Sequence, residues 1–194
     1  MELSALQRIF ESHKNIQATV ITLSRHNNIW IKGMQGSSDA MMAASLFDKT
    51  NDCYLYMLND QESAGYFYHD LTQILGQDNV FFFPSAYKRA IKYGQIDPAN
   101  EILRTEVLSL LQSSGKHFII GSYPEAMAEK VASESALEEN TLHIHTGKEI
   151  DRTFISDTLD KFKFEYVDYV YEPGQYAIRG SIIDVFSFSS EYPY

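Results

Sequence analysis

The sequence is poor in cysteine and positive charge, and it has no long apolar run. Its 194 residues include one cysteine, which excludes a disulfide framework within the chain and a cysteine-based zinc site. We expect this residue, Cys53, to be a small buried apolar side chain. No stretch approaches the ~20 apolar residues that a membrane helix needs. The N-terminus lacks the basic start and apolar core of a signal peptide, so we expect a cytoplasmic protein.

Positive charge is scarce, since 16 Lys and Arg stand against 26 Asp and Glu, a formal net charge of −10. Nucleic-acid binding draws most of its affinity from Lys and Arg at phosphates, so direct DNA binding is disfavoured. The small basic cluster of Lys88, Arg89 and Lys92 makes only a weak DNA site against this balance. An acidic surface suits a protein partner better, because charge complementarity steers association.

Apolar residues make up 44% of the chain and aromatic residues 13%, enough for a sizeable core. Strand and helix patterns alternate over residues 17–131, which predicts an α/β domain with a parallel sheet flanked by helices. The unbroken apolar stretch at 52–58 is typical of a sheet covered on both faces. The expected strands are 18–23, 29–31, 52–58, 80–83 and 117–121, and the expected helices are 3–10, 40–48, 60–75, 101–112 and 124–131.

The pattern changes at the polar, acidic segment 133–140, which we interpret as the boundary between domains at 1–132 and 141–194. The expected elements beyond it are a strand at 142–145, a helix at 151–161, and strands at 166–171 and 175–188 joined by a turn at 172–174. Gly174 in that turn is expected to need positive φ. We expect this smaller domain to be α+β with an antiparallel sheet, and to be truncated at Tyr194.

Residues 33–40 stand between an expected strand and an expected helix, the position of a phosphate-binding loop. In the pattern Gly-x-x-x-x-Gly-Lys-Ser/Thr, backbone N–H groups cradle phosphates, the Lys reaches them and the hydroxyl binds Mg²⁺. Gly33 and Gly36 are present, but the second signature glycine, the lysine and the hydroxyl are replaced by Ser38, Asp39 and Ala40. Cleavage of the γ-phosphate depends on positioning and charge neutralisation, so we predict neither ATP hydrolysis nor tight nucleotide binding.

The same loop is also compatible with a plain turn between a strand and a helix. In that interpretation Ser37 or Ser38 is the N-cap, and the helix dipole favours Asp39. Both interpretations predict an inactive loop.

The segment 172–186, Glu-Pro-Gly-Gln-Tyr-Ala-Ile-Arg-Gly-Ser-Ile-Ile-Asp-Val-Phe, is the most specific pattern in the chain. Arg179 and Gly180 are candidates for a bulge or an exposed edge. An exposed Arg can make bidentate bonds to a carboxylate of a partner. In the alternative interpretation, Arg179 pairs internally with Asp184 or Glu172 and only stabilises the sheet.

This segment resembles the signature shared by the nucleotide-excision-repair protein UvrB and the bacterial transcription-repair-coupling factors. The loop at 33–40 resembles the degenerate loop in the N-terminal, UvrB-like module of the latter family. The resemblance implies a degenerate helicase-like domain at 1–132, similar to UvrB domain 1a, and part of a UvrA-binding domain at 141–194. The UvrA-binding residues that it implies are Arg179, Gly180, Asp184, Phe186 and Tyr166.

By the same resemblance, the chain is a non-catalytic fragment without a cofactor that recruits UvrA to RNA polymerase stalled at DNA damage. The full-length protein would be an ATP-dependent DNA translocase, with RNA polymerase, DNA, ATP and Mg²⁺ bound by other domains. One departure is visible, because the stretch 164–166 lacks the basic residues that help to contact UvrA in the family, and Lys161 and Lys163 lie nearby instead. Two rival functions stay open: a helicase-type or nucleotidase-type fragment, and a DNA-binding wedge.

Two further groups of side chains are candidates for a metal site and a base-stacking site. His143 and His145 share one face of an expected strand, but no third ligand is nearby, so we do not expect a metal centre. An aromatic group can stack on bases, although core packing explains it better. Its members are Tyr166, Tyr169, Tyr171 and Tyr176.

Overall fold

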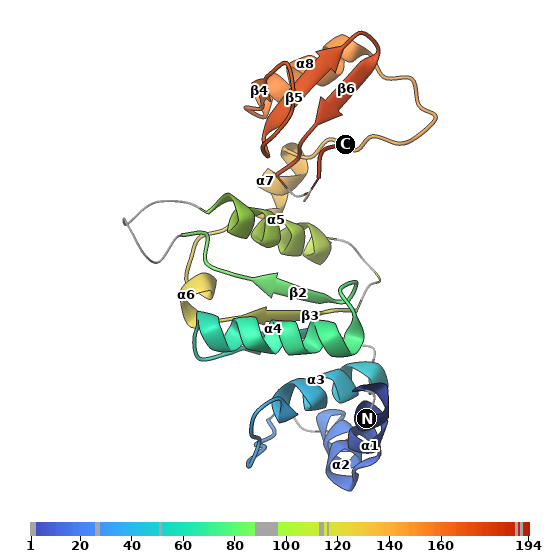
Figure 1. Ribbon diagram of the computed structural model, residues 1–194, viewed down its shortest axis with the longest axis vertical. Helices are drawn as coiled ribbons and strands as arrows, with labels where there is room; N and C mark the ends of the chain where they lie inside the picture. The colour runs from blue at the N-terminus through green and yellow to red at the C-terminus, as the bar shows by residue number, and fades with distance from the viewer. Residues whose placement is uncertain are drawn as a thin grey trace. The chain divides into compact units, whose positions relative to one another are not determined.

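The computed structural model describes residues 3–25, 28–50, 52–87, 97–112, 115, 117–188, 190 and 192–194. Within these ranges the fold is mixed α/β, with one three-stranded parallel sheet and a second small sheet (Figure 1). The chain divides into two compact units, Met1–Ser85 with Ser114–Ala128 and Ala86–Ser113 with Glu129–Tyr194. The basic cluster predicted at Lys88, Arg89 and Lys92 falls outside the described residues.

The sheet of the first unit contains three of the five strands that were predicted. They are β1 (Tyr54–Met57), β2 (Val80–Phe83) and β3 (Ile119–Ser122), in the order β1-β3-β2 and parallel throughout. The central strand β3 is buried along its whole length, so it forms the middle of the core.

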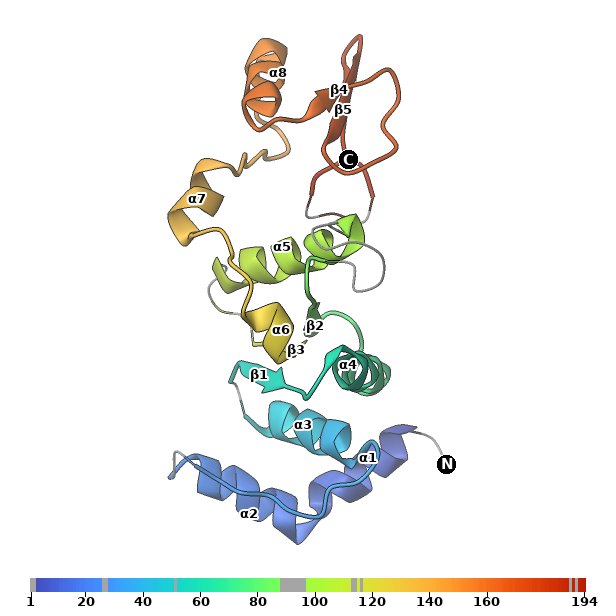
Figure 2. The same cartoon turned by 90° about the vertical axis from the view of Figure 1, so that its left-hand side faces the viewer.

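Helix α4 (Gln61–Leu75) packs against β2 and β3 on one face of this sheet (Figure 2). It ends at Gly76, with φ +82, as predicted, and it begins one residue later than predicted, because Asp60 is its N-cap and its carboxylate accepts the Ser63 N–H. The core beneath it is apolar. Its buried residues are Ala40, Ala43, Ala44, Phe47, Phe67, Leu71, Val80 and Ile119.

Three helices precede the first strand: α1 (Leu3–Ser12), α2 (Lys14–Leu23) and α3 (Ser38–Lys49). The strand predicted at 18–23 is wrong, because these residues form the second half of α2, which contacts α1 and α3. The strand propensity of β-branched residues is weak and depends on context. The strand predicted at 29–31 is also wrong, because these residues form no strand.

The prediction that both faces of the sheet are covered is wrong for β1. Tyr54 and Tyr56 are half-buried on the α4 side, whereas Leu55 is 52% and Met57 57% exposed. Cys53, predicted to be buried, is exposed. The apolar run at 52–58 therefore belongs to an edge strand with one solvent-exposed face, and not to a strand covered on both faces.

The remaining predicted helices are present with shifted ends. Helix α5 (Pro98–Gln112) begins earlier than predicted, with the proline in its first turn, and α6 (Pro124–Met127) ends earlier. The polar segment interpreted as a boundary contains helix α7 (Glu134–Glu139). Helix α8 (Arg152–Lys161) is as predicted. No helix in the described ranges is long and apolar enough to cross a membrane.

The second sheet has the order β4-β5-β6, with β4 (Glu165–Tyr166), β5 (Gln175–Arg179) and β6 (Ile182–Val185). The antiparallel prediction is confirmed for β5 and β6 but wrong for β4, which pairs with β5 in parallel. The turn at 172–174 therefore does not close a hairpin. The strand predicted at 142–145 is wrong, because that segment has no regular structure.

One face of the second sheet packs on α8. Alternate residues of a strand point to the same face, so Tyr176 and Ile178 of β5 both face the helix. Ile155 and Leu159 of α8 are buried against Tyr176. The partly buried residues around them are Ile150, Phe164, Ile178, Ile183 and Val185.

Candidate functional site

The loop at residues 33–40 lacks the strand that was predicted to lead into it. Gly33 and Gly36 both have positive φ, +86 and +58, and a Cβ on either would meet nothing within 4 Å. Both glycines are exposed. The glycines therefore allow the positive φ of an open turn before α3. They are not needed for a close contact with another part of the described chain.

The polar groups of this loop bond within the loop. The Gln35 N–H donates to the Ser38 hydroxyl at 2.7 Å, and the Ala40 N–H donates to the Asp39 carboxylate at 2.8 Å. Ser37 occupies the N-cap position without a side-chain capping bond. The plain-turn interpretation is thus right about Ser37 as N-cap and about Asp39 in the first turn.

Ala40 stands where a phosphate-binding loop carries its metal-binding hydroxyl, and here it is fully buried in the core of the first unit. Its side chain therefore points away from any ligand that would occupy the loop. A phosphate at this helix start would meet the Asp39 carboxylate without a lysine to offset the repulsion.

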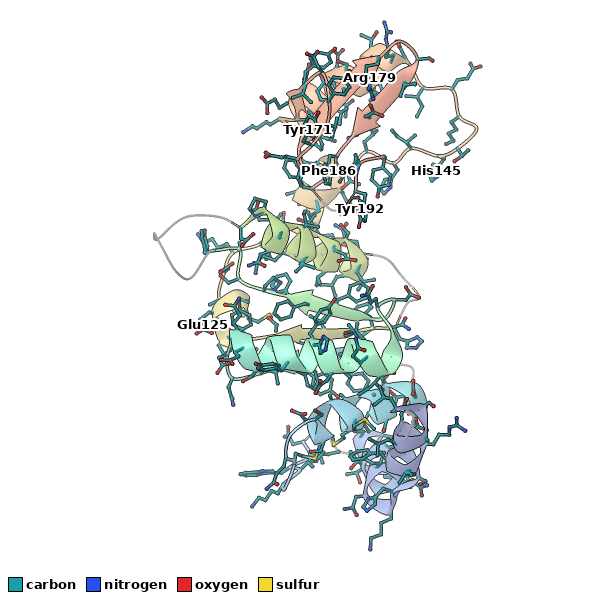
Figure 3. All side chains as sticks on the ribbon, viewed as in Figure 1. Glu125, His145, Tyr171, Arg179, Phe186 and Tyr192 are labelled. Carbon is teal, nitrogen blue, oxygen red and sulfur yellow. The ribbon has the colours of Figure 1, made fainter. Side chains whose placement is uncertain are left out.

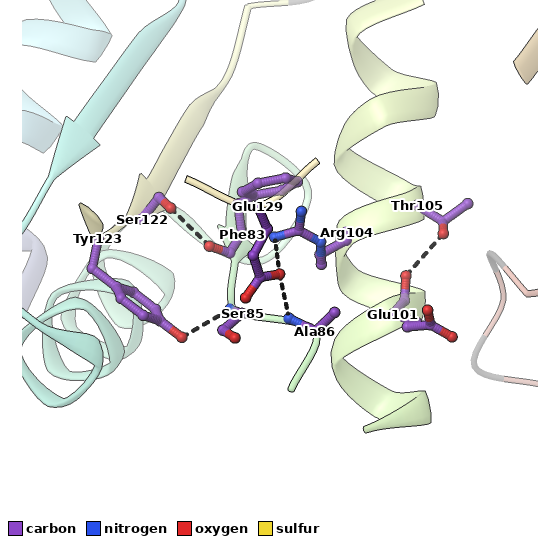
Figure 4. Close-up of polar contacts among 9 residues, drawn as sticks. All are labelled: Phe83, Ser85, Ala86, Glu101, Arg104, Thr105, Ser122, Tyr123 and Glu129. Atoms are coloured by element: carbon purple, nitrogen blue, oxygen red, sulfur yellow. Dashed lines mark hydrogen bonds and ion pairs between the residues drawn. The ribbon is translucent and has the colours of Figure 1, made fainter. Parts of the chain in front are cut away.

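The carboxyl ends of β2 and β3 are the places where open α/β sheets usually hold ligands. Their hydroxyl groups are engaged structurally (Figure 4). The Ser122 hydroxyl donates to the Phe83 carbonyl at 2.8 Å, and the Ser85 N–H donates to the Tyr123 hydroxyl at 2.8 Å. These two hydrogen bonds therefore link β2 and β3 at their carboxyl ends.

The C-terminal motif forms a hairpin. Of the two alternatives predicted for Arg179 and Gly180, a bulge or an exposed edge, the bulge is wrong, while both residues are exposed. Arg179 pairs with Ile182, so the turn consists of Gly180 and Ser181 alone. Gly180 has φ +66, as such tight turns require. The hairpin places Arg179 at the end of its strand, beside the turn.

Arg179 makes the internal pair that was one of its two predicted roles. Its guanidinium forms an ion pair with Asp184 and lies over the Tyr169 ring, 5.2 Å from the ring centre. The Arg179 side chain is nevertheless 48% exposed, and that of Asp184 27%. Because a guanidinium has five N–H donors, this pairing leaves donors free to reach a partner (Figure 3).

The other predicted partner-binding residues lie at different depths. Phe186 is 9% exposed. Its carbonyl accepts the Gly174 N–H and its N–H donates to the Gln175 carbonyl, so these bonds extend the pairing of β5 and β6 beyond the hairpin strands. Tyr166 is 56% exposed, with its ring centre 5.4 Å from that of Tyr176. Of the predicted residues, Arg179 and Tyr166 are therefore accessible to a partner, on opposite faces of the sheet, while Phe186 is buried.

Tyr176 anchors β5 to α8. Its hydroxyl donates to the Asp160 carboxylate at 2.6 Å and lies 3.3 Å from the Ser156 hydroxyl. Burial, and then the bond to Asp160, raise the pKa of Tyr176 above its usual value. Of the predicted aromatic group, Tyr176 is thus a core residue, while Tyr169 and Tyr171 are 59% and 76% exposed.

No metal centre is found within the described ranges, where no three potential ligand side chains come together. His143 and His145 are exposed in a segment without regular structure, so the shared strand face predicted for them is absent.

Sequence reasoning missed two arginine contacts. Arg104 of α5 is 6% exposed and pairs with Glu129 at 3.3 Å, and the same carboxylate oxygen accepts the Ala86 N–H at 2.9 Å (Figure 4). Arg152 donates to the Gly180 carbonyl at 3.1 Å. No sequence signal indicates these contacts, since the partners are 25 or more residues apart in the chain.

Comparisons with known proteins agree with the motif. Residues 142–194 match the UvrB interaction domain family. The chain is 23% identical over 163 residues to the transcription-repair-coupling factor of Bacillus subtilis, and 23% identical over 162 residues to that of Escherichia coli. These matches cover 84% and 83% of this chain but 14% of each relative, so the chain spans about one seventh of their length. Residues 142–194 are therefore similar to the UvrB interaction domain, and the chain is similar to part of the transcription-repair-coupling factors.

Proposed function

We propose that this chain is a non-catalytic, UvrB-like module that binds UvrA through residues 142–194. In the full-length protein it would recruit UvrA to RNA polymerase stalled at DNA damage during nucleotide excision repair. The observation that carries the proposal is the half-exposed Arg179, oriented by Asp184 and Tyr169 on the tight hairpin of a UvrB interaction domain. A guanidinium fixed in this way has lost little freedom before it meets a partner's carboxylate.

The first unit is proposed to be a helicase-like scaffold with a degenerate nucleotide loop. This interpretation is supported by the buried Ala40, the acidic Asp39 and the loop's internal hydrogen bonds. ATP and Mg²⁺ handling, DNA contact and RNA polymerase contact are assigned to other parts of the full-length protein, and the compartment is proposed to be the cytoplasm.

The direct test is a calorimetric titration of purified UvrA with this chain and with Arg179→Ala. We expect the substitution to weaken binding by roughly 10- to 30-fold, because a central arginine contact is worth about 1.4–2 kcal/mol. Lys148→Ala is the matched control, since it removes an exposed cation from the irregular segment after α7. The proposal fails if the unsubstituted chain does not bind UvrA.

A further inference from the structure

One face of helix α8 carries three polar residues that reach towards the sheet. Arg152, Ser156 and Asp160 follow one another at four-residue spacing, which places them in one row along the helix. Ser156 and Asp160 meet the Tyr176 hydroxyl, and Arg152 meets the Gly180 carbonyl. The row therefore runs along β5 and brings Arg152 to the hairpin turn.

The turn thereby holds two guanidinium groups from different elements. Arg179 is the last residue of β5, and Gly180, which accepts the bond from Arg152, follows it in the chain. Arg152 is exposed, and its guanidinium donates a hydrogen bond to the Gly180 carbonyl through one nitrogen. Each arginine thus has donors left over for a ligand outside the chain.

The acids beside this pair are already engaged. Asp184 is paired with Arg179, and the Asp151 carboxylate accepts the Thr153 N–H as the N-cap of α8. The two arginines and these two carboxylates balance in charge, so the turn is locally neutral in a chain that carries a net charge of −10.

The position of Arg152 is not explained by the stability of its helix. It is the first residue of α8, where the positive end of the helix dipole opposes a cation. A residue that breaks a local rule in this way often marks a functional site. On the Arg179 side of the turn, its cross-strand partner Ile182 and the Tyr169 ring beneath it are both 59% exposed, so apolar area lies beside Arg179.

We propose that Arg152 and Arg179 act together as a two-arginine clamp for a carboxylate-bearing surface of UvrA. This inference rests on the proposed function and adds a second contact residue to it. Two planar guanidinium groups around one turn can each bind a carboxylate in bidentate fashion, which a lysine cannot reproduce. The exposed Ile182, the cross-strand partner of Arg179, adds apolar area to the contact.

The test is a titration of UvrA with Arg152→Gln, Arg152→Lys and Arg179→Gln, singly and with both arginines replaced. We expect Arg152→Gln to weaken binding by about 10-fold, Arg152→Lys to recover only part of that loss, and the charge-removing variants to flatten the salt dependence. The double variant is expected to lose less than the product of the single effects, because the two arginines share one ligand surface. Lys148→Gln is the control, and it is expected to bind like the unsubstituted chain.

The outcomes separate the two claims. Absence of UvrA binding by the unsubstituted chain would contradict the proposed function itself. Normal binding and an unchanged salt dependence for Arg152→Gln, beside a weakened Arg179→Gln, would overturn the clamp and leave the proposed function intact. A thermal unfolding curve of each variant shows whether a loss of binding comes from misfolding instead.

Discussion

Gly174 lies so close to the Phe188 ring that a Cβ on it would be 2.5 Å from the ring Cζ. The same glycine has φ +85, as expected for the turn after Pro173. The T-shaped packing of Phe164 on Phe188, with ring centres 5.1 Å apart, holds the ring over this glycine. Two independent physical reasons thus require glycine at this position.

Gly174→Ala should therefore destabilise the second unit through both effects. The left-handed backbone alone costs an alanine about 1–2 kcal/mol, and the collision with Phe188 adds to it. Gly147→Ala is the matched control, because Gly147 has φ +87 with nothing within 4 Å of its Cβ position. Denaturant unfolding should show a larger loss for Gly174→Ala, part of which Phe188→Ala recovers. Equal losses at the two glycines would contradict the role of the ring.

The buried pair of Arg104 and Glu129 should matter more for stability than the exposed pair of Arg179 and Asp184. Arg104→Ala removes the Arg104 guanidinium from the Glu129 carboxylate, which is 16% exposed, and we expect a loss of about 3 kcal/mol. Arg179→Ala removes a half-exposed pair and should cost less than about 1 kcal/mol. Urea unfolding of both variants measures the difference, and the reverse order would show that the Arg104 pair is not a structural anchor.

Tyr176 makes the stability of the folded chain depend on pH in the alkaline range. Because its pKa is raised in the folded state, its contribution is complete below the unfolded value of about 10 and is lost as pH rises through the folded value. Tyr176→Phe should be less stable at pH 8 by about 1 kcal/mol, through loss of the bond to Asp160. Between pH 9 and 11 it should lose less stability than the unsubstituted chain. Parallel pH curves would show that the Tyr176 hydroxyl does not titrate with unfolding.

The loop at 33–40 should not regain nucleotide binding when the signature residues are restored. Ser38→Gly, Asp39→Lys and Ala40→Ser together supply the missing glycine, lysine and hydroxyl. Ala40 is fully buried, so the new hydroxyl enters the core and costs about 1–3 kcal/mol if unsatisfied. Equilibrium titration with ATP and Mg²⁺ should show no tight binding by either chain. Tight binding by the restored variant would mean that the loop has the geometry of a nucleotide site.

The sequence was informative where periodicity and caps acted locally. Helices α4 and α8 lie where periodicity predicted them, and α4 ends at the predicted Gly76; Asp60 and Asp151, expected as first helical residues, are their N-caps. It failed at 18–23, where β-branched residues lie in a helix that packs on other helices. Strand order, the parallel pairing of β4 and the turn at Gly180 depend on contacts that local patterns do not encode.

The sequence motif of the candidate site could be predicted, but the spatial arrangement of its side chains could not. Arg179 and Asp184 were named as a possible pair from the residue pattern, and the structure contains that pair. The roles of Tyr169 and Arg152 were not predictable, because α8 and the segment before β5 are brought to the hairpin only by folding of the whole unit.

The central claim is that UvrA binds at the hairpin of the second unit, and hydrogen–deuterium exchange of this chain with and without UvrA tests it most directly. We predict slower exchange in the first turn of α8 and in residues 175–186 when UvrA is present, and unchanged exchange in α1, α2 and α3. Protection confined to those three helices, or no protection anywhere at saturating UvrA, would contradict the account.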